Sequence, residues 1–541
     1  MTTHPMSESP AQPFESTKSR LVDVLCLALL TLGCAYATLF CASALDVAGH
    51  AIGADDSYIS YRYAQNLVDG HGLVFNPGVR VEGFTNLLYV LIMALPLLLH
   101  WDVYLFSVFF NTVLVAATLL VLLKHWRAAS GERTALLGGL LFALSPSIWL
   151  WASSGLETSL VLFLQVCAWI LVERVCNGSS TRSLGALCVV LSTLALTRAD
   201  GFVTAAIVLA FLLVKRRFRP ALITGSVVGC VVAGLFTWRL AYYHELLPNT
   251  YYAKVSGSLF QRLWSSIREL GGISARQGMA LYVLSVVFAL LSRRWHASGI
   301  QKVIETLSFE LFFTVAWLSY WLYGGGDNFE DRFLIVLIPI GITILMLEVL
   351  QASVENLRLF VACCACVVQL SVPVRDAQYG KHLLPKYDYR ILIGRFVGEH
   401  WPGQLLATPA AGKIPYFSRL QTIDMLGLTD HFLARIPPKN FAVGHSKEDS
   451  SYVLSRNPDV IATVFYGDGL DLGAEFGQRK YENAGYRVHY LVNSTTESRA
   501  GKNIIDVLGR SAADIIVLSH LGWRAVVLDR NPERQTKASS R

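Results

Sequence analysis

Residues 53–86 read GADDSYISYRYAQNLVDGHGLVFNPGVRVEGFTN, a polar segment between two apolar runs. Its glycines permit tight backbone turns. Two adjacent acids, Asp55 and Asp56, stand at its start, shortly after the first apolar run. A polar, turn-rich segment at a membrane surface can hold a carboxylate against a hydroxyl group, as a general base, or against a metal ion. The segment therefore predicts chemistry at the surface of a membrane.

The composition around this segment is that of a polytopic membrane protein. Of the 541 residues, 53% are hydrophobic and 16% are charged, whereas a soluble domain has about 25% charged residues. The net charge of +7 lies in short Lys/Arg runs between apolar segments. This is the pattern of cytoplasmic loops, so no nucleic-acid partner is expected. All ten cysteines fall in apolar segments, which argues against a disulfide framework.

Apolar runs of membrane length predict about eleven transmembrane helices, with the N-terminus inside and the C-terminus outside. The predicted spans lie at 21–44, 103–123, 134–152, 157–175, 183–197, 202–214, 221–242, 278–292, 307–323, 332–350 and 357–372. A further run, 86–99, contains Pro96 and would place every later basic loop outside if it crossed the membrane. We interpret it as an interfacial or re-entrant helix whose apolar face could hold a lipid tail.

The spans divide the chain into four predicted parts: a cytoplasmic tail (1–20), a transmembrane domain (21–372) with outer loops at 45–102 and 243–277, an extracytoplasmic domain (373–529), and a disordered tail (530–541). The extracytoplasmic domain alternates strand-like and helix-like runs, which predicts a soluble α/β domain. Its strand-like runs are 404–408, 460–465, 486–492 and 515–518, and its helix-like runs are 447–455 and 472–484.

The charged residues of the outer loops also have ordinary explanations. Asp55, Asp56 and Glu157 stand where helices begin, and the helix dipole favours carboxylates there. Arg198 and Asp200 lie between two short apolar runs, where they could form an ion pair that closes a turn. Long basic side chains can also extend from apolar surface to water without further function, and Lys254 follows two tyrosines typical of a membrane interface.

The segment 53–86 resembles the first outer loop of GT-C glycosyltransferases that use polyprenyl-phosphate arabinofuranose, a family that includes the mycobacterial-type terminal cell-wall arabinofuranosyltransferases. Further similar motifs follow in the family's order: SGLETSL (154–160), LTRADG (196–201), LLPNTYYAKVSG (246–257), GGGDNFEDRF (324–333) and AGKIPYFSRLQTIDMLGLTDHFLAR (411–435). In GGGDNFEDRF, three acids stand where the family pattern has one acid and then an arginine.

The resemblance implies a GT-C membrane fold and transfer of a sugar, arabinofuranose, from a polyprenyl phosphate to a cell-envelope glycan, glycolipid or protein outside the cytoplasmic membrane of a bacterium. It places the catalytic acids on Asp55 and Asp56, one of which would accept the proton of the attacking hydroxyl. The leaving lipid phosphate needs cations, and the candidates are Arg62, His71, Arg198, Lys254 and Arg332. The candidates for contacting the sugar or acceptor are Glu82, Asn86, Glu157, Asp200, Asn249, Tyr251 and Asp327.

Neither a nucleotide-binding motif nor a zinc-ligand spacing is convincing, which fits a donor that is already lipid-linked. A divalent cation, Mg²⁺ or Mn²⁺, could be held by Asp55 and Asp56. Two alternatives stay open: a GT-C enzyme for another lipid-linked sugar, such as mannose or aminoarabinose, and a transporter or flippase of lipid-linked sugars. A transporter would carry acids within its spans, whereas here the acids gather in outer loops, which favours surface chemistry.

Overall fold

The computed structural model describes residues 53–178, 181–254, 258–276, 282, 285, 307–326, 332–346, 388–438, 447–464, 481, 483–493, 503–510, 514, 517–518, 521, 523 and 525–530. The predicted spans 21–44, 278–292 and 357–372 lie wholly or almost wholly outside these residues, as do both predicted tails. The count of eleven spans therefore stays a prediction.

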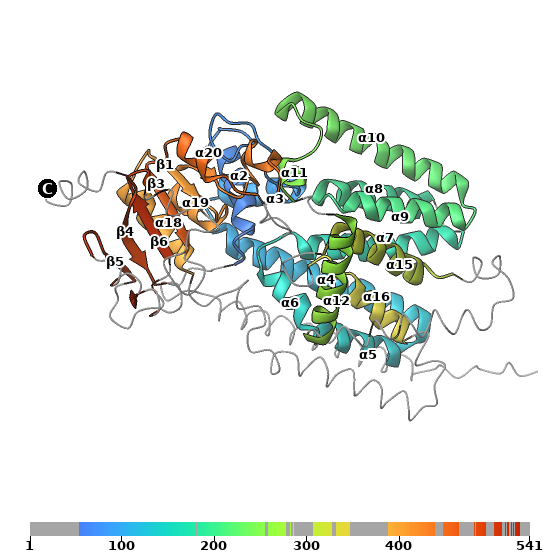
Figure 1. Cartoon of the computed structure of the whole chain (residues 1–541). Helices are drawn as coiled ribbons and strands as arrows, with labels where there is room; N and C mark the ends of the chain where they lie inside the picture. Colours follow the sequence, from blue (N-terminus) through green and yellow to red (C-terminus); the bar gives the residue numbers. More distant parts are fainter. Residues whose placement is uncertain are drawn as a thin grey trace, which may run out of the picture.

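The described chain up to residue 346 is helical. Its helices are α2 (Ser57–Val68), α3 (Leu87–Leu98), α4 (Val103–Ser130), α5 (Glu132–Ala143), α6 (Pro146–Ser153), α7 (Thr158–Cys176), α8 (Thr181–Thr197), α9 (Gly201–Val214), α10 (Phe218–Tyr243), α11 (Asn249–Lys254), α12 (Leu259–Arg276), α15 (Phe309–Gly324) and α16 (Leu337–Ile344). Figure 1 shows α7, α8, α9 and α10 running alongside one another, with α2, α3 and α11 at the end of the bundle that faces the C-terminal domain.

Three helices of the described chain, α4, α7 and α10, are long and apolar enough to cross a membrane. The predicted span at 134–152 is divided in the structure into α5 and α6, which meet at a 50° bend. Pro146 is the first residue of α6, and proline is disfavoured in a helix interior but suits a first helical position. The bent pair is a fourth candidate span.

The short helix α3 corresponds to the apolar run that we do not count as a span. It has 12 residues and contains Pro96, and it packs against α2. Leu91, Leu95 and Leu98 are exposed on its surface. A helix of this length is too short for a bilayer, in agreement with the sequence prediction, while its place at the membrane interface stays a prediction.

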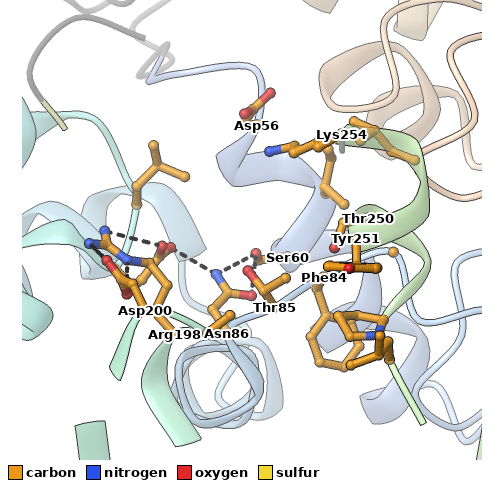
Figure 2. A pocket seen from close by; sticks show the side chains of 18 of the residues that line it. Asp56, Ser60, Phe84, Thr85, Asn86, Arg198, Asp200, Thr250, Tyr251 and Lys254 are labelled. Carbon is orange, nitrogen blue, oxygen red and sulfur yellow. Dashed lines mark hydrogen bonds and ion pairs between the residues drawn. The ribbon is translucent and has the colours of Figure 1, made fainter. Parts of the chain in front are cut away.

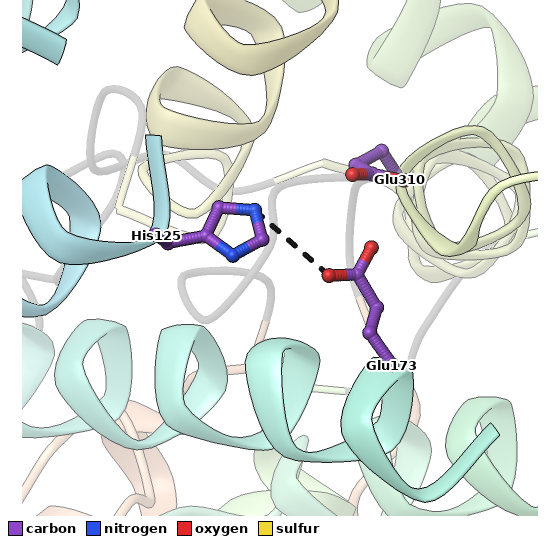
Figure 3. Close-up of side chains that lie close together, drawn as sticks. All are labelled: His125, Glu173 and Glu310. Atoms are coloured by element: carbon purple, nitrogen blue, oxygen red, sulfur yellow. Dashed lines mark ion pairs between the residues drawn. The ribbon is translucent and has the colours of Figure 1, made fainter. Parts of the chain in front are cut away.

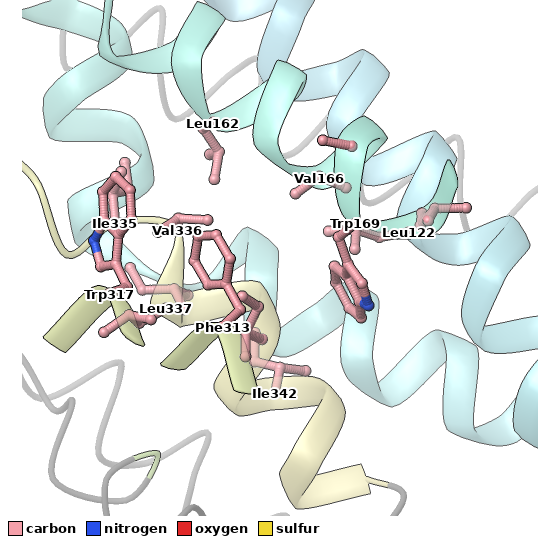
Figure 4. Close-up of a cluster of buried hydrophobic side chains, with 14 of the residues drawn as sticks. Leu122, Leu162, Val166, Trp169, Phe313, Trp317, Ile335, Val336, Leu337 and Ile342 are labelled. Atoms are coloured by element: carbon pink, nitrogen blue, oxygen red, sulfur yellow. The ribbon is translucent and has the colours of Figure 1, made fainter. Parts of the chain in front are cut away.

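A cluster of buried tryptophans and aliphatic side chains joins helices that are far apart in the sequence (Figure 4). Trp126, Trp169 and Trp317 are fully or almost fully buried. The indole Nε1 of Trp126 donates to Thr343 Oγ1 at 2.8 Å, which links α4 to α16. Because buried indoles need such a partner, this contact fixes how the two helices pack.

The C-terminal domain is a six-stranded sheet with helices on both faces. Its elements are α18 (Tyr389–His400), β1 (Leu405–Thr408), α19 (Lys413–Ser418), β2 (Gln421–Asp424), a short 3-10 helix (Leu433–Arg435), α20 (Ser450–Ser455), β3 (Val460–Val464), β4 (Arg487–Val492), β5 (Ile504–Asp506) and β6 (Ala525–Asp529). The strand order is β2-β1-β3-β6-β4-β5. Strands β2, β1 and β3 are parallel, whereas β6 is antiparallel to β3 and β4, and β5 is antiparallel to β4.

Side chains alternate between the two faces of this sheet, as the pleat of a strand requires. Leu406 and Val460 pack with α18 on one face, while Ala407 and Ile461 pack with α20 on the other. The predicted strands 404–408, 460–465 and 486–492 correspond to β1, β3 and β4.

Two other segments of this domain differ from the sequence prediction. The predicted strand at 515–518 is wrong, since Val517 and Leu518 are helical. The predicted helix 447–455 begins later, at Ser450. The predicted helix 472–484 lies almost entirely outside the described residues.

Candidate active site

A cavity of about 410 Å³ lies at the end of the helical bundle, between the first outer loop, the start of α7, the turn before α9, and α11. Eight of the residues predicted from the sequence line it: Asp56, Asn86, Glu157, Arg198, Asp200, Tyr251, Lys254 and Arg332. They come from six separate segments of the chain. The structure therefore brings most of the predicted site together.

Asp56 directs its carboxylate toward the cavity (Figure 2). It precedes α2, yet its side chain makes no capping hydrogen bond to that helix. Its Oδ2 lies 3.8 Å from Nη1 of Arg332, whose side chain is 8% exposed. The ordinary explanation of Asp56 as a helix cap therefore does not account for its position.

Asp55 has a different environment, although it is the neighbouring residue. Its Oδ1 accepts a hydrogen bond of 3.0 Å from the backbone N–H of Lys413, in the C-terminal domain. Removal from water raises the pKa of Asp55, against the opposing effect of Arg390 and Lys413. A Cβ at position 412 would overlap the Asp55 carbonyl oxygen, so Gly412 permits this close approach. Asp55 does not line the cavity with Asp56, contrary to the expectation of a joint acidic pair.

One wall of the cavity is a network of buried polar side chains. Asn86 Nδ2 donates to Glu157 Oε2 at 2.8 Å and to Ser60 Oγ at 3.0 Å. Asn86 and Glu157 are each about 5% exposed. Glu157 precedes α7 without capping it through its side chain. The network fixes the orientation of amide and carboxylate groups that could bind hydroxyl groups.

Arg198 is bound by acids on two sides. Its Nε donates to Asp200 Oδ1 at 2.8 Å and its Nη2 to Asp200 Oδ2 at 2.5 Å, while Nη1 lies 3.9 Å from Glu157 Oε1. This is the ion pair that the sequence allowed as the ordinary explanation of Arg198. Because two carboxylates face one guanidinium, the group as a whole is negative, and this weakens the case for Arg198 as the principal phosphate ligand.

Lys254 and Arg332 supply positive charge to the same space. Lys254, at the end of α11, has no hydrogen bond or ion pair within the described part of the chain, and it lines the cavity together with Asp56 (Figure 2). Arg332 lies over the ring of Phe333, with its guanidinium carbon 5.1 Å from the ring centroid. Both cations line the cavity, where an anionic group that enters would meet them.

Comparison with known proteins gives the fold. The crystal structure of ArnT from Cupriavidus metallidurans in the apo state aligns over 94% of this chain and 98% of its own, with a TM-score of 0.55 and 12% sequence identity. The structure of the same protein bound to undecaprenyl phosphate aligns over 95% and 98%, with a TM-score of 0.53 and 12% identity. The chain has the GT-C fold. It is a multi-pass membrane protein of that fold.

A curated relative supports the resemblance at the sequence level. The protein of Mycobacterium tuberculosis named terminal beta-(1->2)-arabinofuranosyltransferase is 26% identical over 346 residues, which are 54% of this chain and 53% of the relative. The chain thus spans about half the length of the curated relative that it matches. The similarity to arabinofuranosyltransferases that the sequence motifs indicated is confirmed. Residues 377–505 match a family described as Domain of unknown function (DUF8728).

The remaining predicted residues that the structure describes do not line the cavity. Arg62 is 5% exposed, and its guanidinium donates to the carbonyls of Phe75, at 2.7 Å, Leu420, at 2.6 Å, and Pro415. Burial lowers the pKa of Arg62 to about 9. His71 lies on the exposed surface of the loop. For both residues, a contact with the donor phosphate stays a prediction.

Asn249 does not line the cavity, but it holds a loop that does. Its Nδ2 donates to the carbonyls of Gly427, Leu428 and Asp430 at 2.9–3.1 Å. These bonds hold a loop of the C-terminal domain against the bundle, and Leu428 of this loop lines the cavity. Asp327 lies outside the described residues.

Arg239 is a cavity residue that the sequence did not single out. It lies in α10, within a predicted span, where a single arginine has no motif around it. Its Nε lies 2.9 Å from Oε2 of Glu82. Burial raises the pKa of Glu82 to about 6, although Arg239 opposes the shift. Glu82 itself does not line the cavity, and its contact with the sugar or acceptor stays a prediction. Other lining residues not predicted include Ser60, Phe84, Thr250 and Tyr320.

The two aspartates do not form a chelating pair in this arrangement. Asp55 faces Lys413, and Asp56 faces Arg332. Within the described residues, three ligand groups close enough to hold a metal ion occur instead at His125, Glu173 and Glu310. A divalent cation shared by Asp55 and Asp56 stays a prediction.

Proposed function

We propose that the protein is a membrane glycosyltransferase that transfers an arabinofuranosyl residue from a polyprenyl phosphate to a glycan, glycolipid or protein of the cell envelope. The reaction takes place on the extracytoplasmic face of the cytoplasmic membrane of a bacterium, and the C-terminal domain lies on that side. The observation that carries the proposal is the meeting of Asp56, Lys254 and Arg332 in one cavity. Similarity to an arabinofuranosyltransferase, and to ArnT, which has been crystallised with undecaprenyl phosphate, supports the choice of donor.

In the proposed reaction, Asp56 accepts the proton of an acceptor hydroxyl while that oxygen forms a bond to the anomeric carbon. The bond from the anomeric carbon to the phosphate oxygen breaks, and the polyprenyl phosphate leaves with the electron pair. Lys254 and Arg332 stabilise the charge that develops on this phosphate. The sequence of steps corresponds to a single displacement with inversion at the anomeric carbon.

The polar wall of the cavity is suited to bind the sugar. Asn86, Glu157 and Asp200 carry amide and carboxylate oxygens that accept hydrogen bonds from hydroxyl groups, and all three are buried. Their positions are fixed by the bonds to Ser60 and Arg198. A preorganised wall of this kind reduces the entropic cost of orienting the sugar.

The lipid tail of the donor would leave the cavity along α3. Asn86 lines the cavity and immediately precedes this helix, whose exposed leucines continue away from it. An apolar helix surface that begins at the site of the phosphate provides contact for a polyprenyl chain, which interacts with apolar surface in proportion to the area covered.

The test uses the full chain, purified in lipid nanodiscs and incubated with radiolabelled polyprenyl phosphates that carry arabinofuranose, mannose or aminoarabinose. We expect consumption of the arabinofuranose donor, with loss of that activity in Asp56→Asn. Asp69→Asn is the matched control, since Asp69 belongs to the same loop but forms an exposed ion pair with Arg419. Consumption of another donor would replace the proposed sugar. Movement of a lipid-linked sugar across the bilayer without any transfer would favour the transporter.

A further inference from the structure

A second cavity, of about 470 Å³, lies at the opposite end of α7 from the candidate active site. Glu157, just before α7, lines the first cavity, and Glu173, in its last turn, lines the second. Sixteen residues of helix separate them, or about 24 Å at the rise of an α-helix. The second cavity is therefore not part of the site described above.

Three metal-ligating side chains meet in this second cavity (Figure 3). They are His125 of α4, Glu173 of α7 and Glu310 in the first turn of α15. One ligand atom from each lies within 4.8 Å of the other two, and Nε2 of His125 is 3.8 Å from Oε2 of Glu173. Figure 3 shows the three side chains converging from different helices.

The burial of Glu310 is what separates this group from an ordinary surface cluster. Glu310 is 5% exposed, and its Oε2 has no hydrogen-bond partner within the described residues. The helix dipole favours an acid in the first turn of α15, but it does not explain a carboxylate that is buried and directed at a second carboxylate. A buried carboxylate oxygen without a partner is costly unless another group binds it.

We propose that His125, Glu173 and Glu310 bind a divalent transition-metal ion of the Zn²⁺ class. Imidazole nitrogen and carboxylate oxygen are both zinc ligands, and three protein ligands leave a fourth position for water. Ligand atoms around a tetrahedral zinc lie about 3.4 Å apart for bonds of about 2.1 Å. The ligand atoms of the three side chains would therefore need to approach one another by up to about 1.4 Å. Rotation of the side chains is sufficient for this movement.

Such an ion would join α4, α7 and α15, which are far apart in the sequence. It would balance the two negative charges, beside the basic residues Arg174 and Lys215 that line the same cavity. The other end of α15 carries Tyr320, which lines the candidate active site. The ion would therefore fix the position of a helix that reaches both cavities, while remaining too far away to take part in sugar transfer.

The test measures metal binding and thermal unfolding of the full chain in nanodiscs after removal of metals with a chelator. We expect the wild-type protein to take up one equivalent of Zn²⁺ and to give the visible absorption of a four-coordinate site with Co²⁺. Zn²⁺ should also raise its unfolding temperature, since it binds only the folded chain. In Glu310→Gln and His125→Gln, we expect Zn²⁺ affinity to fall by about 100-fold or more, because loss of an outer-shell contact alone can cost 10- to 100-fold.

Glu132→Gln is the matched control, since Glu132 begins α5 and lies outside the cluster, and it should bind Zn²⁺ like the wild type. Two results would overturn the proposal: no stoichiometric uptake by the wild-type chain, which would mean that the two carboxyl groups share a proton instead, or unchanged affinity in both ligand variants. Should one variant fail to fold, the other still decides. None of these measurements depends on sugar transfer.

Discussion

The two sides of the first outer loop contrast sharply, although their residues alternate in the sequence. On the cavity side, Asp56, Ser60 and Asn86 direct their side chains into a space of about 410 Å³. On the docking side, formed by Asp55, Arg62 and Asn76, the side chains bind backbone atoms of the C-terminal domain. Side chains of one short segment thus line the cavity at some positions and hold the C-terminal domain at others.

The chemistry of bonding also differs between the two sides. The docking side forms hydrogen bonds mostly to backbone carbonyl and N–H groups of residues 413–422. Such backbone groups are present whatever side chains these residues carry. Lys413 returns a bond of 2.7 Å to the carbonyl of Gly53 and forms an ion pair with Asp388. Substitutions on the docking side should therefore lower stability and transfer together, while those on the cavity side should lower transfer alone.

The largest expected effect is that of Asp56→Asn. Removal of a general base lowers transfer by about 100-fold or more. The unfolding temperature should change little, because Asp56 makes no capping bond and its contact with Arg332 is long, at 3.8 Å. Asp55→Asn should lower the unfolding temperature as well as transfer, since Asp55 binds Lys413. The measurement is turnover of the lipid-linked donor beside a thermal unfolding curve. Near-normal turnover in Asp56→Asn would show that another group is the base.

Arg62→Met tests the docking side directly. The substitution keeps the length of the side chain but deprives the buried carbonyls of Phe75, Pro415 and Leu420 of a charged donor. We expect the free energy of unfolding to fall by about 3 kcal/mol, as for buried acceptors that lose such a bond. Protease cleavage of the C-terminal domain should accelerate in parallel. An unchanged cleavage rate, with transfer lost, would instead assign Arg62 to the donor phosphate.

Lys254→Gln should weaken donor binding without destabilising the fold. A charge-assisted bond to phosphate contributes about 1.5–3 kcal/mol, so the affinity for a water-soluble short-chain donor analogue should fall by about tenfold or more. Arg198→Gln is the informative comparison. It leaves Asp200 and Glu157 without their cation, and should lower the unfolding temperature. Equal affinity in wild type and Lys254→Gln, with loss in Arg198→Gln, would restore Arg198 as the phosphate ligand.

The sequence predicted the class of fold and most of the cavity from local patterns. Apolar runs indicated the membrane helices, and the resemblance of the motifs to the GT-C family made Asn86, Glu157 and Asp200 site candidates. The structure brings these three residues to the same end of the bundle. The division between Asp55 and Asp56 could not be predicted, since it depends on where Gly412 and Lys413 dock, more than 350 residues later. Arg239 was missed because one charge within an apolar helix has no periodic signature.

Glu82 belongs to the same loop and forms an ion pair with Arg239. The pH dependence of stability shows whether burial or this ion pair has the larger effect on the pKa of Glu82. Its pKa is raised from 4.5 to about 6, because burial disfavours the carboxylate more than Arg239 favours it. A raised pKa in the folded state means that Glu82 contributes stability below about pH 4.5, and that this contribution is lost as the pH rises through about 6.

The rise in the pKa of Glu82 from 4.5 to about 6 corresponds to a change of about 2 kcal/mol in the free energy of unfolding. At low pH, the free energy of unfolding of Glu82→Gln should equal that of the wild type, in which Glu82 is protonated. Between pH 4.5 and pH 7, the wild type should become less stable than Glu82→Gln by about 2 kcal/mol. Unfolding curves of both proteins across this range give the difference directly, because contributions from other groups cancel. A flat difference would mean that the bond to Arg239 cancels the effect of burial. A gain by the wild type with rising pH would mean that this bond outweighs burial and that the pair stabilises the cavity wall at neutral pH.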